Sequence, residues 1–385
     1  MQPFAFNTTR SIQFGVGALS RIGELAVATF GTRAMLITDP GMMKTGIVER
    51  AIQVLKSAGI ELTLFAEVEG DPPEAIILAA TDRARSAGVQ GVIGLGGGSS
   101  LDVAKLVALL AVGNETLAQV YGVGNAKGPR LPLILVPTTS GTGSEVTPIS
   151  IVTTGAAEKM GVVSPVLLPD VALLDPELTY GLPPHVTAAT GIDAMVHAIE
   201  AYASASANNN PLSRGLATQA LHLMGSALLR SVRDGKDTAA RSDMLLGSML
   251  AGQAFANSPV AAVHALAYPL GGHFHIPHGL SNALVLPHVL RFNTVTAHAA
   301  YVDLAPYAFP QLAALQGQER VSAFCEALTQ LSVDCGLPQR LRDLNVTEDW
   351  LPRLAKDAMN QTRLLVNNPR PITEADVMAI YRAAY

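Results

Sequence analysis

The sequence has few cysteines, a modest charge and no long hydrophobic run. Its 385 residues include 2 cysteines, Cys325 and Cys335, which are too few for a disulfide-stabilised scaffold. The formal net charge of −5 gives no electrostatic case for binding nucleic acid. The most apolar run, residues 106–113, is too short to span a bilayer. The first residues lack the basic segment and apolar stretch of a signal peptide, so we expect a cytoplasmic protein without a membrane partner.

Internal repeats and low-complexity segments are also absent from the sequence. Charged residues make up only 15% of the chain, whereas hydrophobic residues make up 49%. Much of the chain must therefore be buried, and its length is sufficient for two domains that each have a core.

The first half of the chain alternates short apolar runs with segments of helical periodicity. Residues 47–58 and 73–87 carry apolar side chains at helical spacing. This alternation predicts a parallel sheet with helices on both faces. The predicted strands cover residues 34–39, 60–66, 91–95 and 133–136.

Strand signals fade after about residue 175, and a Leu-Pro-Pro break follows at residues 182–184. The remainder is rich in Ala, Leu and Met at helical spacing. We therefore predict an α/β domain over residues 1–182 and an all-helical domain over residues 183–385.

Two loops follow predicted strands and are candidates for nucleotide binding. The segment GLGGGSSLD, residues 94–102, opens a predicted helix over residues 101–111. Glycines allow a pyrophosphate to approach the backbone, and a helix N-terminus presents free N–H groups to it. The segment does not match G-x-G-x-x-G, so a glycine-rich turn required only for packing is the alternative. The second loop, PTTSGTGSE at residues 137–145, suits a ligand crevice or an ordinary turn before a helix.

Aspartate and histidine residues in the second half form a candidate metal site. Asp193 and His197 are four residues apart, which places both on one face of a helix. His264 and His278 bound the histidine-rich part of the chain, and five of the nine histidines lie between residues 264 and 288. One carboxylate and three imidazoles suit a divalent transition metal that acts as a Lewis acid on a hydroxyl or carbonyl. The alternative is a set of hydrogen-bonded core residues.

Several sequence blocks, in one order, resemble the iron-dependent (group III) alcohol dehydrogenase family over nearly the full length. The resemblance implies an N-terminal α/β nucleotide-binding domain and a C-terminal helical domain of the dehydroquinate synthase-like superfamily. It also implies an active site in the cleft between these domains. The blocks are GGGSSLDVAK at 96–105, PTTSGTGSEVT at 137–147, LLDPELTYGLPP at 173–184, GIDAMVHAIEAY at 191–202 and PHGLSNALVLPHVLRFN at 277–293, and the ending NNPRPITEADVMAIYRAAY is similar to the family's C-terminus.

The resemblance also implies roles for individual residues. The implied ligands of Fe(II), or alternatively Zn(II), are Asp193, His197, His264 and His278. The implied cofactor-binding residues are Gly96, Gly97, Gly98, Ser99, Asp102, Thr138, Thr139, Thr142 and Lys159. Asp39 ends the first predicted strand, where a carboxylate can bind the adenosine ribose and repel the 2′-phosphate of NADP. We therefore expect NAD rather than NADP; the alternative for Asp39 is a turn residue before Pro40.

One position departs from the commonest family pattern. Many members have a second histidine four residues after the one at position 264, where this chain has Tyr268. A phenol there can hydrogen-bond the substrate oxygen or pass a proton to solvent. The tyrosine is similar to the hydroxyacid–oxoacid transhydrogenase branch. Phe255 is expected to line the substrate pocket or to be part of a helix core.

These observations predict an NAD-dependent, metal-dependent oxidoreductase that interconverts a small alcohol and its aldehyde, with His264 and Tyr268 in the catalytic site. A hydroxyacid–oxoacid transhydrogenase or a 4-hydroxybutyrate-type dehydrogenase is the alternative. Dehydroquinate synthase-like or glycerol-1-phosphate dehydrogenase-like activity is less favoured, because residues 254–269 and 271–279 contain no Lys or Arg. A non-catalytic nucleotide- or metal-binding protein is the remaining alternative.

The family resemblance further implies a homodimer or a higher homo-oligomer. Residues Phe4 to Phe14 are expected to supply an edge strand that pairs with another chain. The sequence does not determine the substrate, the direction of the reaction, the resident metal or whether the cofactor leaves after each turnover.

Overall fold

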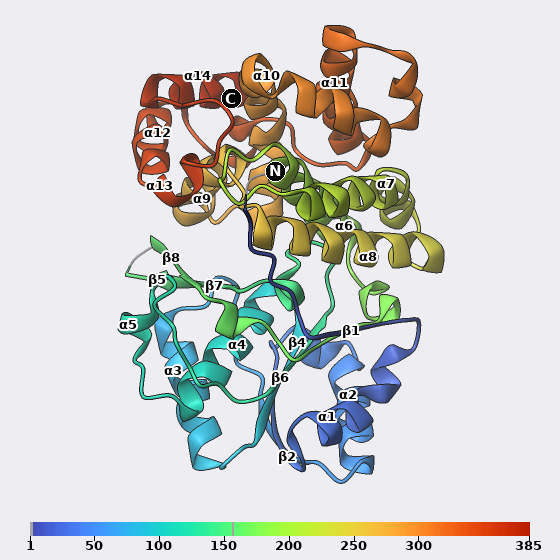
Figure 1. The fold of residues 1–385 in the computed structure, drawn as a ribbon, viewed down its shortest axis with the longest axis vertical. Helices are drawn as coiled ribbons and strands as arrows, with labels where there is room; N and C mark the ends of the chain where they lie inside the picture. The colour runs from blue at the N-terminus through green and yellow to red at the C-terminus, as the bar shows by residue number, and fades with distance from the viewer. Residues whose placement is uncertain (1–2, 156–157) are drawn as a thin grey trace. The chain divides into compact units, whose positions relative to one another are not determined.

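The computed structural model describes residues 3–155 and 158–385 and divides the chain into two compact units (Figure 1). One unit is Asn7–Gly181. The other comprises Leu182–Tyr385 and the described residues that precede Asn7.

A six-stranded parallel sheet forms the centre of the α/β unit. The strand order is β1-β9-β6-β4-β2-β3. The central strands β4 and β6 are apolar sequences, GVIGLG and LILVP, and all their residues are buried, as expected for strands covered on both faces. The predicted parallel sheet is confirmed. Its strands are β1 (Ser11–Phe14), β2 (Arg33–Ile37), β3 (Glu61–Phe65), β4 (Gly91–Gly96), β6 (Leu133–Pro137) and β9 (Val171–Leu174).

Helices cover both faces of this sheet. Alternate residues of β2 point to opposite faces: Ala34 and Leu36 pack in one hydrophobic core and Met35 and Ile37 in the other. The first core includes residues of α1 (Ile22–Phe30) and α2 (Ile47–Ser57), and the second includes α3 (Glu74–Ser86) and α4 (Gly98–Val112). In Figure 1, α3 and α4 lie on one side of the sheet and α1 and α2 on the other.

The strand order reverses direction between β2 and β4. After β2 the chain continues to β3 on one side, and after β3 it returns to β4 on the other side of β2. Ligands of open α/β sheets bind at the carboxyl ends of the two strands that flank such a reversal. Asp39 follows β2 and Gly97 follows β4, so the predicted ribose-binding residue and the predicted glycine-rich loop both lie at this point.

A second, three-stranded sheet in this unit has the order β5-β8-β7. Strands β7 (Ile149–Thr154) and β8 (Glu158–Val163) form an antiparallel hairpin, and β5 (Gly122–Val123) pairs parallel to β8. Sequence analysis did not predict this sheet because the half-buried β7, ISIVTT, contains no long apolar run. The other short elements of the unit are α5 (Leu117–Val120), η1 (Ala18–Arg21), η2 (Met42–Lys44), η3 (Ser144–Val146), η4 (Pro165–Leu167) and η5 (Pro176–Thr179).

The second unit contains only helices in its described residues, which confirms the predicted all-helical region. Helix α6 is mostly buried and packs against α7, α8 and α10. A Cβ on Gly191 of α6 would lie 2.3 Å from Leu228 Cδ1 and 2.9 Å from Met244 Cε, so any larger residue here would displace these two side chains. Among the described residues, no helix has the length and apolar character needed to cross a membrane.

The helices of this unit have the following bounds: α6 (Pro184–Ala203), α7 (Pro211–Arg233), α8 (Thr238–Asn257), α9 (Ala262–Phe274), α10 (His278–Ala308), α11 (Gly317–Asp334), α12 (Leu351–Met359), α13 (Thr362–Leu365), α14 (Glu374–Ala384), and the short η6 (Pro310–Ala314), η7 (Leu341–Leu344) and η8 (Glu348–Trp350).

Candidate metal and cofactor sites

Three helices of the second unit bring one carboxylate and three imidazoles together. Asp193 and His197 lie on α6, His264 lies on α9, and His278 is the first residue of α10. The candidate ligand atoms of these four residues all lie within 4.8 Å of one another. The first three residues are buried, whereas the His278 side chain is 41% exposed. The cluster therefore has one side that solvent or a small substrate can reach.

A glycine allows α10 to begin beside α6. A Cβ on Gly279 would lie 2.4 Å from the carbonyl oxygen of Ala189 and 3.3 Å from the Cβ of Asp193. Any side chain at this position would push the start of α10 away from α6. Gly279 thus keeps His278 close to Asp193.

Glu200 fixes the orientation of His264. Its Oε2 lies 2.6 Å from His264 Nδ1, and its Oε1 accepts a hydrogen bond of 2.7 Å from the backbone N–H of Val263. A carboxylate at this distance requires the proton on Nδ1, so a neutral imidazole presents an unprotonated Nε2 on its other side.

The free nitrogen of His264 fits a metal ligand. His264 Nε2 is buried and has no hydrogen-bond partner among the described residues. It lies 3.8 Å from Asp193 Oδ1. A buried acceptor without a partner costs free energy, which a metal ion at the centre of the cluster would recover. The donor set of one oxygen and three nitrogens also suits Fe(II) or Zn(II).

Asn282 orients the carboxylate of Asp193. Asn282 Nδ2 donates to Asp193 Oδ1 over 2.5 Å and lies 3.2 Å from His278 Nε2. Burial alone would raise the pKa of Asp193, but His197, His278, His264 and this hydrogen bond outweigh that effect and leave the pKa below its usual value. Asp193 is therefore ionised near neutral pH, as a metal ligand must be.

Aromatic rings surround the cluster. Phe255 stacks on His197 with ring centroids 4.3 Å apart, and His197 stacks on His264 at 4.7 Å. Tyr268 is half-buried, and its ring centroid lies 5.9 Å from that of His278. Both predicted pocket residues, Phe255 and Tyr268, thus contact candidate ligands.

The other histidines of the same segment have different surroundings. His273 Nε2 lies 2.8 Å from Asp357 of α12, so this pair links α9 to α12. His275 follows the end of α9 with a left-handed φ of 53°. Partial burial and, to a smaller extent, the charge of Arg291 lower the pKa of His288 to about 4. His288 is thus a neutral, half-buried residue of α10 near pH 7.

The α/β unit brings most of the predicted cofactor residues to the carboxyl edge of its large sheet. Asp39 accepts hydrogen bonds from the backbone N–H of Met42 over 2.9 Å and from Ser100 Oγ over 3.3 Å. Gly96 has φ 152°, and a Cβ there would lie 2.8 Å from Ser100 Oγ. The start of α4 therefore lies directly beside the acidic residue after β2.

The glycine loop (residues 96–98) and the threonine loop (residues 137–145) contact each other. A Cβ on Gly98 would lie 2.8 Å from the Thr142 side chain, and one on Gly97 would lie 3.7 Å from Thr139. The backbone N–H of Thr138 donates to the carbonyl of Gly96 over 3.0 Å. No side chain of the described residues caps the N-terminus of α4, so its first N–H groups, including that of Ser99, are suited to a phosphate.

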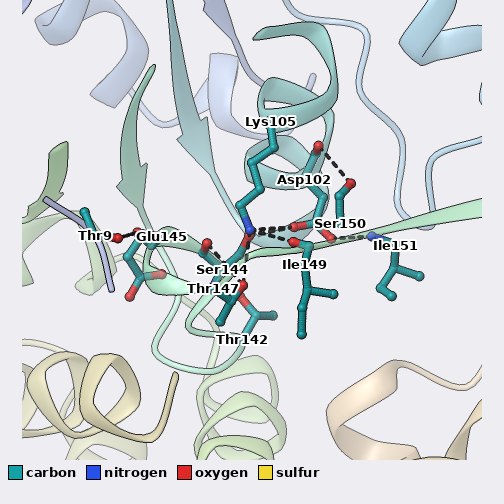
Figure 2. A network of polar contacts seen from close by, with 10 residues as sticks. All are labelled: Thr9, Asp102, Lys105, Thr142, Ser144, Glu145, Thr147, Ile149, Ser150 and Ile151. Atoms are coloured by element: carbon teal, nitrogen blue, oxygen red, sulfur yellow. Dashed lines mark hydrogen bonds and ion pairs between the residues drawn. The ribbon is translucent and has the colours of Figure 1, made fainter. Parts of the chain in front are cut away.

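Two predicted cofactor residues instead make contacts within the protein. The Asp102 carboxylate accepts hydrogen bonds from Ser144 Oγ over 2.6 Å and from the backbone N–H of Ile151 over 2.9 Å (Figure 2). Lys159 Nζ lies 2.7 Å from Asp71 and donates to Thr153 Oγ1 over 2.8 Å. Within the described part of the chain, neither side chain forms a hydrogen bond or ion pair with residues 96–98.

Comparison with known proteins identifies the family. Residues 9–176 match the family of iron-containing alcohol dehydrogenases, and residues 187–385 match the C-terminal part of Fe-containing alcohol dehydrogenases. The chain belongs to the iron-containing alcohol dehydrogenase family. The fold and the enzyme class that the sequence predicts, an alcohol dehydrogenase or aldehyde reductase, are thereby confirmed.

Relatives of this alcohol dehydrogenase family align along almost the whole chain. Long-chain-alcohol dehydrogenase 1 of Geobacillus thermodenitrificans is 42% identical over 374 residues, which are 96% of this chain and 94% of the relative. A crystal structure of a 1,3-propanediol oxidoreductase is 35% identical, with a TM-score of 0.95 and full coverage of both chains. The sulfoacetaldehyde reductase of Bifidobacterium kashiwanohense, solved in complex with NAD+, is 30% identical, with a TM-score of 0.88 and coverage of 100% of this chain and 99% of that chain.

The sequence alone did not reveal Glu200 and Asn282 of this alcohol dehydrogenase. Glu200 is seven residues after Asp193 and three after His197, so helical periodicity already places it on the ligand face of α6. Asn282 is four residues after His278 and shares its face of α10. The signal for both was their helical spacing from predicted ligands.

Proposed function

We propose that this alcohol dehydrogenase transfers hydride between NAD(H) and a small alcohol or aldehyde at a metal held by Asp193, His197, His264 and His278. The single observation that carries the proposal is the cluster itself, in which the four ligand atoms lie within 4.8 Å of one another and His264 Nε2 is buried without a partner. The metal, when bound, supplies Lewis-acid chemistry that lowers the pKa of a substrate hydroxyl or polarises a carbonyl.

The protein residues orient and shield the reacting groups. Glu200 holds the His264 ring in one tautomer, and Asn282 holds the Asp193 carboxylate. The Phe255 ring covers His197 and excludes water from that side. Tyr268, beside the exposed His278, is placed to hydrogen-bond the substrate oxygen and to pass its proton to solvent.

NAD is the cofactor that the carboxyl edge of the large sheet favours. The uncapped start of α4 and the glycines of its loop suit a pyrophosphate, and a solved relative binds NAD+. Asp39 lies beside this loop and would accept hydrogen bonds from the ribose hydroxyls, while its charge disfavours the 2′-phosphate of NADP. NAD supplies the hydride acceptor, and the α/β unit supplies its alignment.

Fe(II) is the metal that the family name favours, and Zn(II) is the alternative. Imidazole nitrogen and carboxylate oxygen bind both ions. The Irving–Williams order favours Zn(II) over Fe(II) at such a site, so metal supply decides occupancy as much as affinity does.

The substrate is a small alcohol or aldehyde without a phosphate. The segments around the ligands, residues 254–269 and 271–279, contain no Lys or Arg that would bind one. The relatives carry the names of enzymes for long-chain alcohols, a propanediol and sulfoacetaldehyde, so the family accepts substrates of different size and polarity. Because Tyr268 is similar to the transhydrogenase branch, a hydroxyacid such as 4-hydroxybutyrate is the second candidate substrate. The names of these relatives favour a dehydrogenase reaction over a transhydrogenase reaction.

The remaining assignments concern the assembly and its compartment. We propose a cytoplasmic homodimer or larger homo-oligomer in which β1, an edge strand bonded to β9 in this chain, pairs with a second copy. A monomer in light scattering would contradict that arrangement.

The test is NADH formation from a panel of primary alcohols, diols and 4-hydroxybutyrate. Protein reconstituted with Fe(II) or Zn(II) is compared with protein treated with a chelator. We expect turnover only with metal, and the best substrate distinguishes a simple alcohol dehydrogenase from a hydroxyacid enzyme. Turnover that is unchanged by the chelator would contradict the proposal.

A further inference from the structure

We propose that Lys105 is a positioning residue for the cofactor, whose buried ammonium fixes the three chain segments assigned to NAD without touching the nucleotide. The inference rests on the proposed function, because it assumes that NAD binds at this edge of the sheet. Lys105 lies on α4, and its side chain is 0% exposed, so no ligand can reach its Nζ.

The ammonium group has an acceptor for each of its protons. Lys105 Nζ donates to Ser144 Oγ over 2.7 Å, to the Ile149 carbonyl over 2.7 Å and to Thr147 Oγ1 over 3.2 Å. Asp102 Oδ1 lies 3.5 Å away and supplies the opposite charge. A buried cation is tolerated only when it is paired and hydrogen-bonded in this way.

These partners belong to different segments of the predicted cofactor site. Lys105 itself extends from the helix that begins at the glycine loop. Ser144 belongs to the threonine loop, and its N–H donates to Thr142 Oγ1 over 3.3 Å. Gly98 packs against this Thr142 side chain. Figure 2 shows the Lys105 side chain reaching from α4 to this loop, with Nζ at the centre of the network.

The third segment is the hairpin β7–β8. Ile149 is the first residue of β7, and Asp102 also accepts a hydrogen bond from the N–H of Ile151 in the same strand. Four residues beyond Ile149, Thr153 pairs with Lys159 across the hairpin. Lys105 and Asp102 therefore connect the helix of the glycine loop to the strand that positions Lys159.

This network also explains the surroundings of Asp102. Its two carboxylate oxygens already accept hydrogen bonds from Ser144 Oγ and the Ile151 N–H. Ser150 Oγ donates to its carbonyl oxygen over 3.0 Å. Asp102 therefore acts on the cofactor through the loop that it holds, as Lys105 does.

The test compares Lys105→Met with Arg130→Met in the same unit. Arg130 is a matched control because it is a cation that is only 14% exposed and that makes four short contacts: to the carbonyls of Leu131, Val166 and Leu168 and to Asp170. Arg130 and Leu131 precede β6, and the other three partners precede β9, so these contacts lie at the amino edge of the sheet. The threonine loop instead begins at the carboxyl end of β6. A merely structural role would affect both variants alike.

The measurements are the Kd for NAD+ by calorimetric titration, the unfolding midpoint and the Kd for Zn(II). For Lys105→Met we expect the Kd for NAD+ to rise about tenfold or more, which corresponds to about 1.4 kcal/mol, with an unchanged Kd for Zn(II). For Arg130→Met we expect a lower unfolding midpoint and a Kd for NAD+ within about twofold of wild type. In turnover, the KM for NAD+ should rise in Lys105→Met more than kcat falls.

If Lys105→Met does not fold, the milder variant Ser144→Ala tests the positioning role of Lys105. Ser144→Ala removes one partner and leaves the ammonium its contacts with Ile149 and Thr147, so we expect a folded protein with a Kd for NAD+ about threefold higher. Unchanged affinity in Ser144→Ala or Lys105→Met, or equal losses in Lys105→Met and Arg130→Met, would overturn the positioning role. Wild-type protein that does not bind NAD+ would instead contradict the cofactor assignment on which this role depends.

Discussion

The metal cluster and the cofactor edge of this protein use different parts of the chain. In the helical unit, side chains from α6, α9 and α10 form the cluster, and their orientation depends on Glu200 and Asn282. At the edge of the large sheet, the important groups are mainly backbone N–H groups and close loop contacts at Gly96 and Gly98. The metal site therefore depends on a few side chains, whereas the cofactor site depends on the position of the backbone.

This difference predicts how each region responds to substitution. Removal of a single ligand side chain should be sufficient to eliminate metal binding, because no backbone group replaces the lost ligand atom. Removal of a side chain at the cofactor edge should weaken binding by a smaller factor, because most N–H groups remain. The following variants test that contrast.

The largest effect is expected for Asp193→Ala. This variant removes the only carboxylate of the cluster, and we expect kcat/KM to fall by about 10³-fold or more because the Lewis acid is lost. Near-wild-type far-UV circular dichroism and an unchanged Kd for NAD+ are the controls. A metal-depleted Asp193→Ala protein that keeps full turnover would show that the cluster is not the active site.

The next largest effect, a fall in metal affinity, is expected for Glu200→Gln. Glu200 accepts two hydrogen bonds, from Val263 N–H and from His264 Nδ1, whereas the single oxygen of glutamine can accept only at one of these positions. The amide nitrogen must then face the other donor, so the His264 ring turns or changes tautomer. We expect metal affinity to fall by about 10–100-fold, measured by competition with a chromophoric chelator.

A matched control for Glu200→Gln is available in the same unit. Asp357 and His273 form another imidazole–carboxylate pair, with a distance of 2.8 Å, and neither residue belongs to the cluster. Asp357→Asn should leave metal affinity unchanged. Equal losses of metal affinity in both variants would indicate a general effect on the helical unit rather than orientation of His264.

A smaller, selective effect is expected at the cofactor edge for Asp39→Asn. Asparagine can still accept the hydrogen bond from Met42 N–H but carries no charge. The ratio of kcat/KM for NADP to that for NAD should therefore rise by about tenfold, because the repulsion of the 2′-phosphate is removed. An unchanged ratio would place the ribose away from Asp39.

The smallest effect is expected for His288→Gln, which should change the pH dependence of the free energy of unfolding. The folded-state pKa of His288, about 4, lies below the usual 6.5, so the unfolded chain binds a proton more readily. This histidine must therefore lower the free energy of unfolding as the pH falls from about 6.5 to about 4, by about 1 kcal/mol at pH 5 after allowance for its partial exposure. His288→Gln should flatten this part of the pH profile, measured by urea unfolding at pH 7 and pH 5; an unchanged profile would contradict the assignment.

The sequence predicted the elements whose signal is local. Strands β2, β3, β4 and β6 are short apolar runs, and α2 and α3 show helical periodicity, so their positions followed directly from the pattern. The hairpin β7–β8 carries no such run, and its formation depends on packing against α3 and α4. The four candidate ligands were found from spacing together with family resemblance.

The residues that the sequence did not reveal act through partners far along the chain. Glu200 contacts His264, which is 64 residues away, and Lys105 contacts Ser144, which is 39 residues away. In sequence, Lys105 is an ordinary helical lysine three residues after an aspartate. Its burial depends on the threonine loop folding over it, and helical periodicity alone gives no indication of that.

The measurement that tests the central claim most directly is metal stoichiometry in wild type and His264→Ala, each titrated with NAD+ in parallel. We predict one Fe(II) or Zn(II) per wild-type chain, loss of that ion in His264→Ala, and the same Kd for NAD+ in both proteins. Retention of one tightly bound metal ion by folded His264→Ala would contradict the assignment of the metal to this cluster.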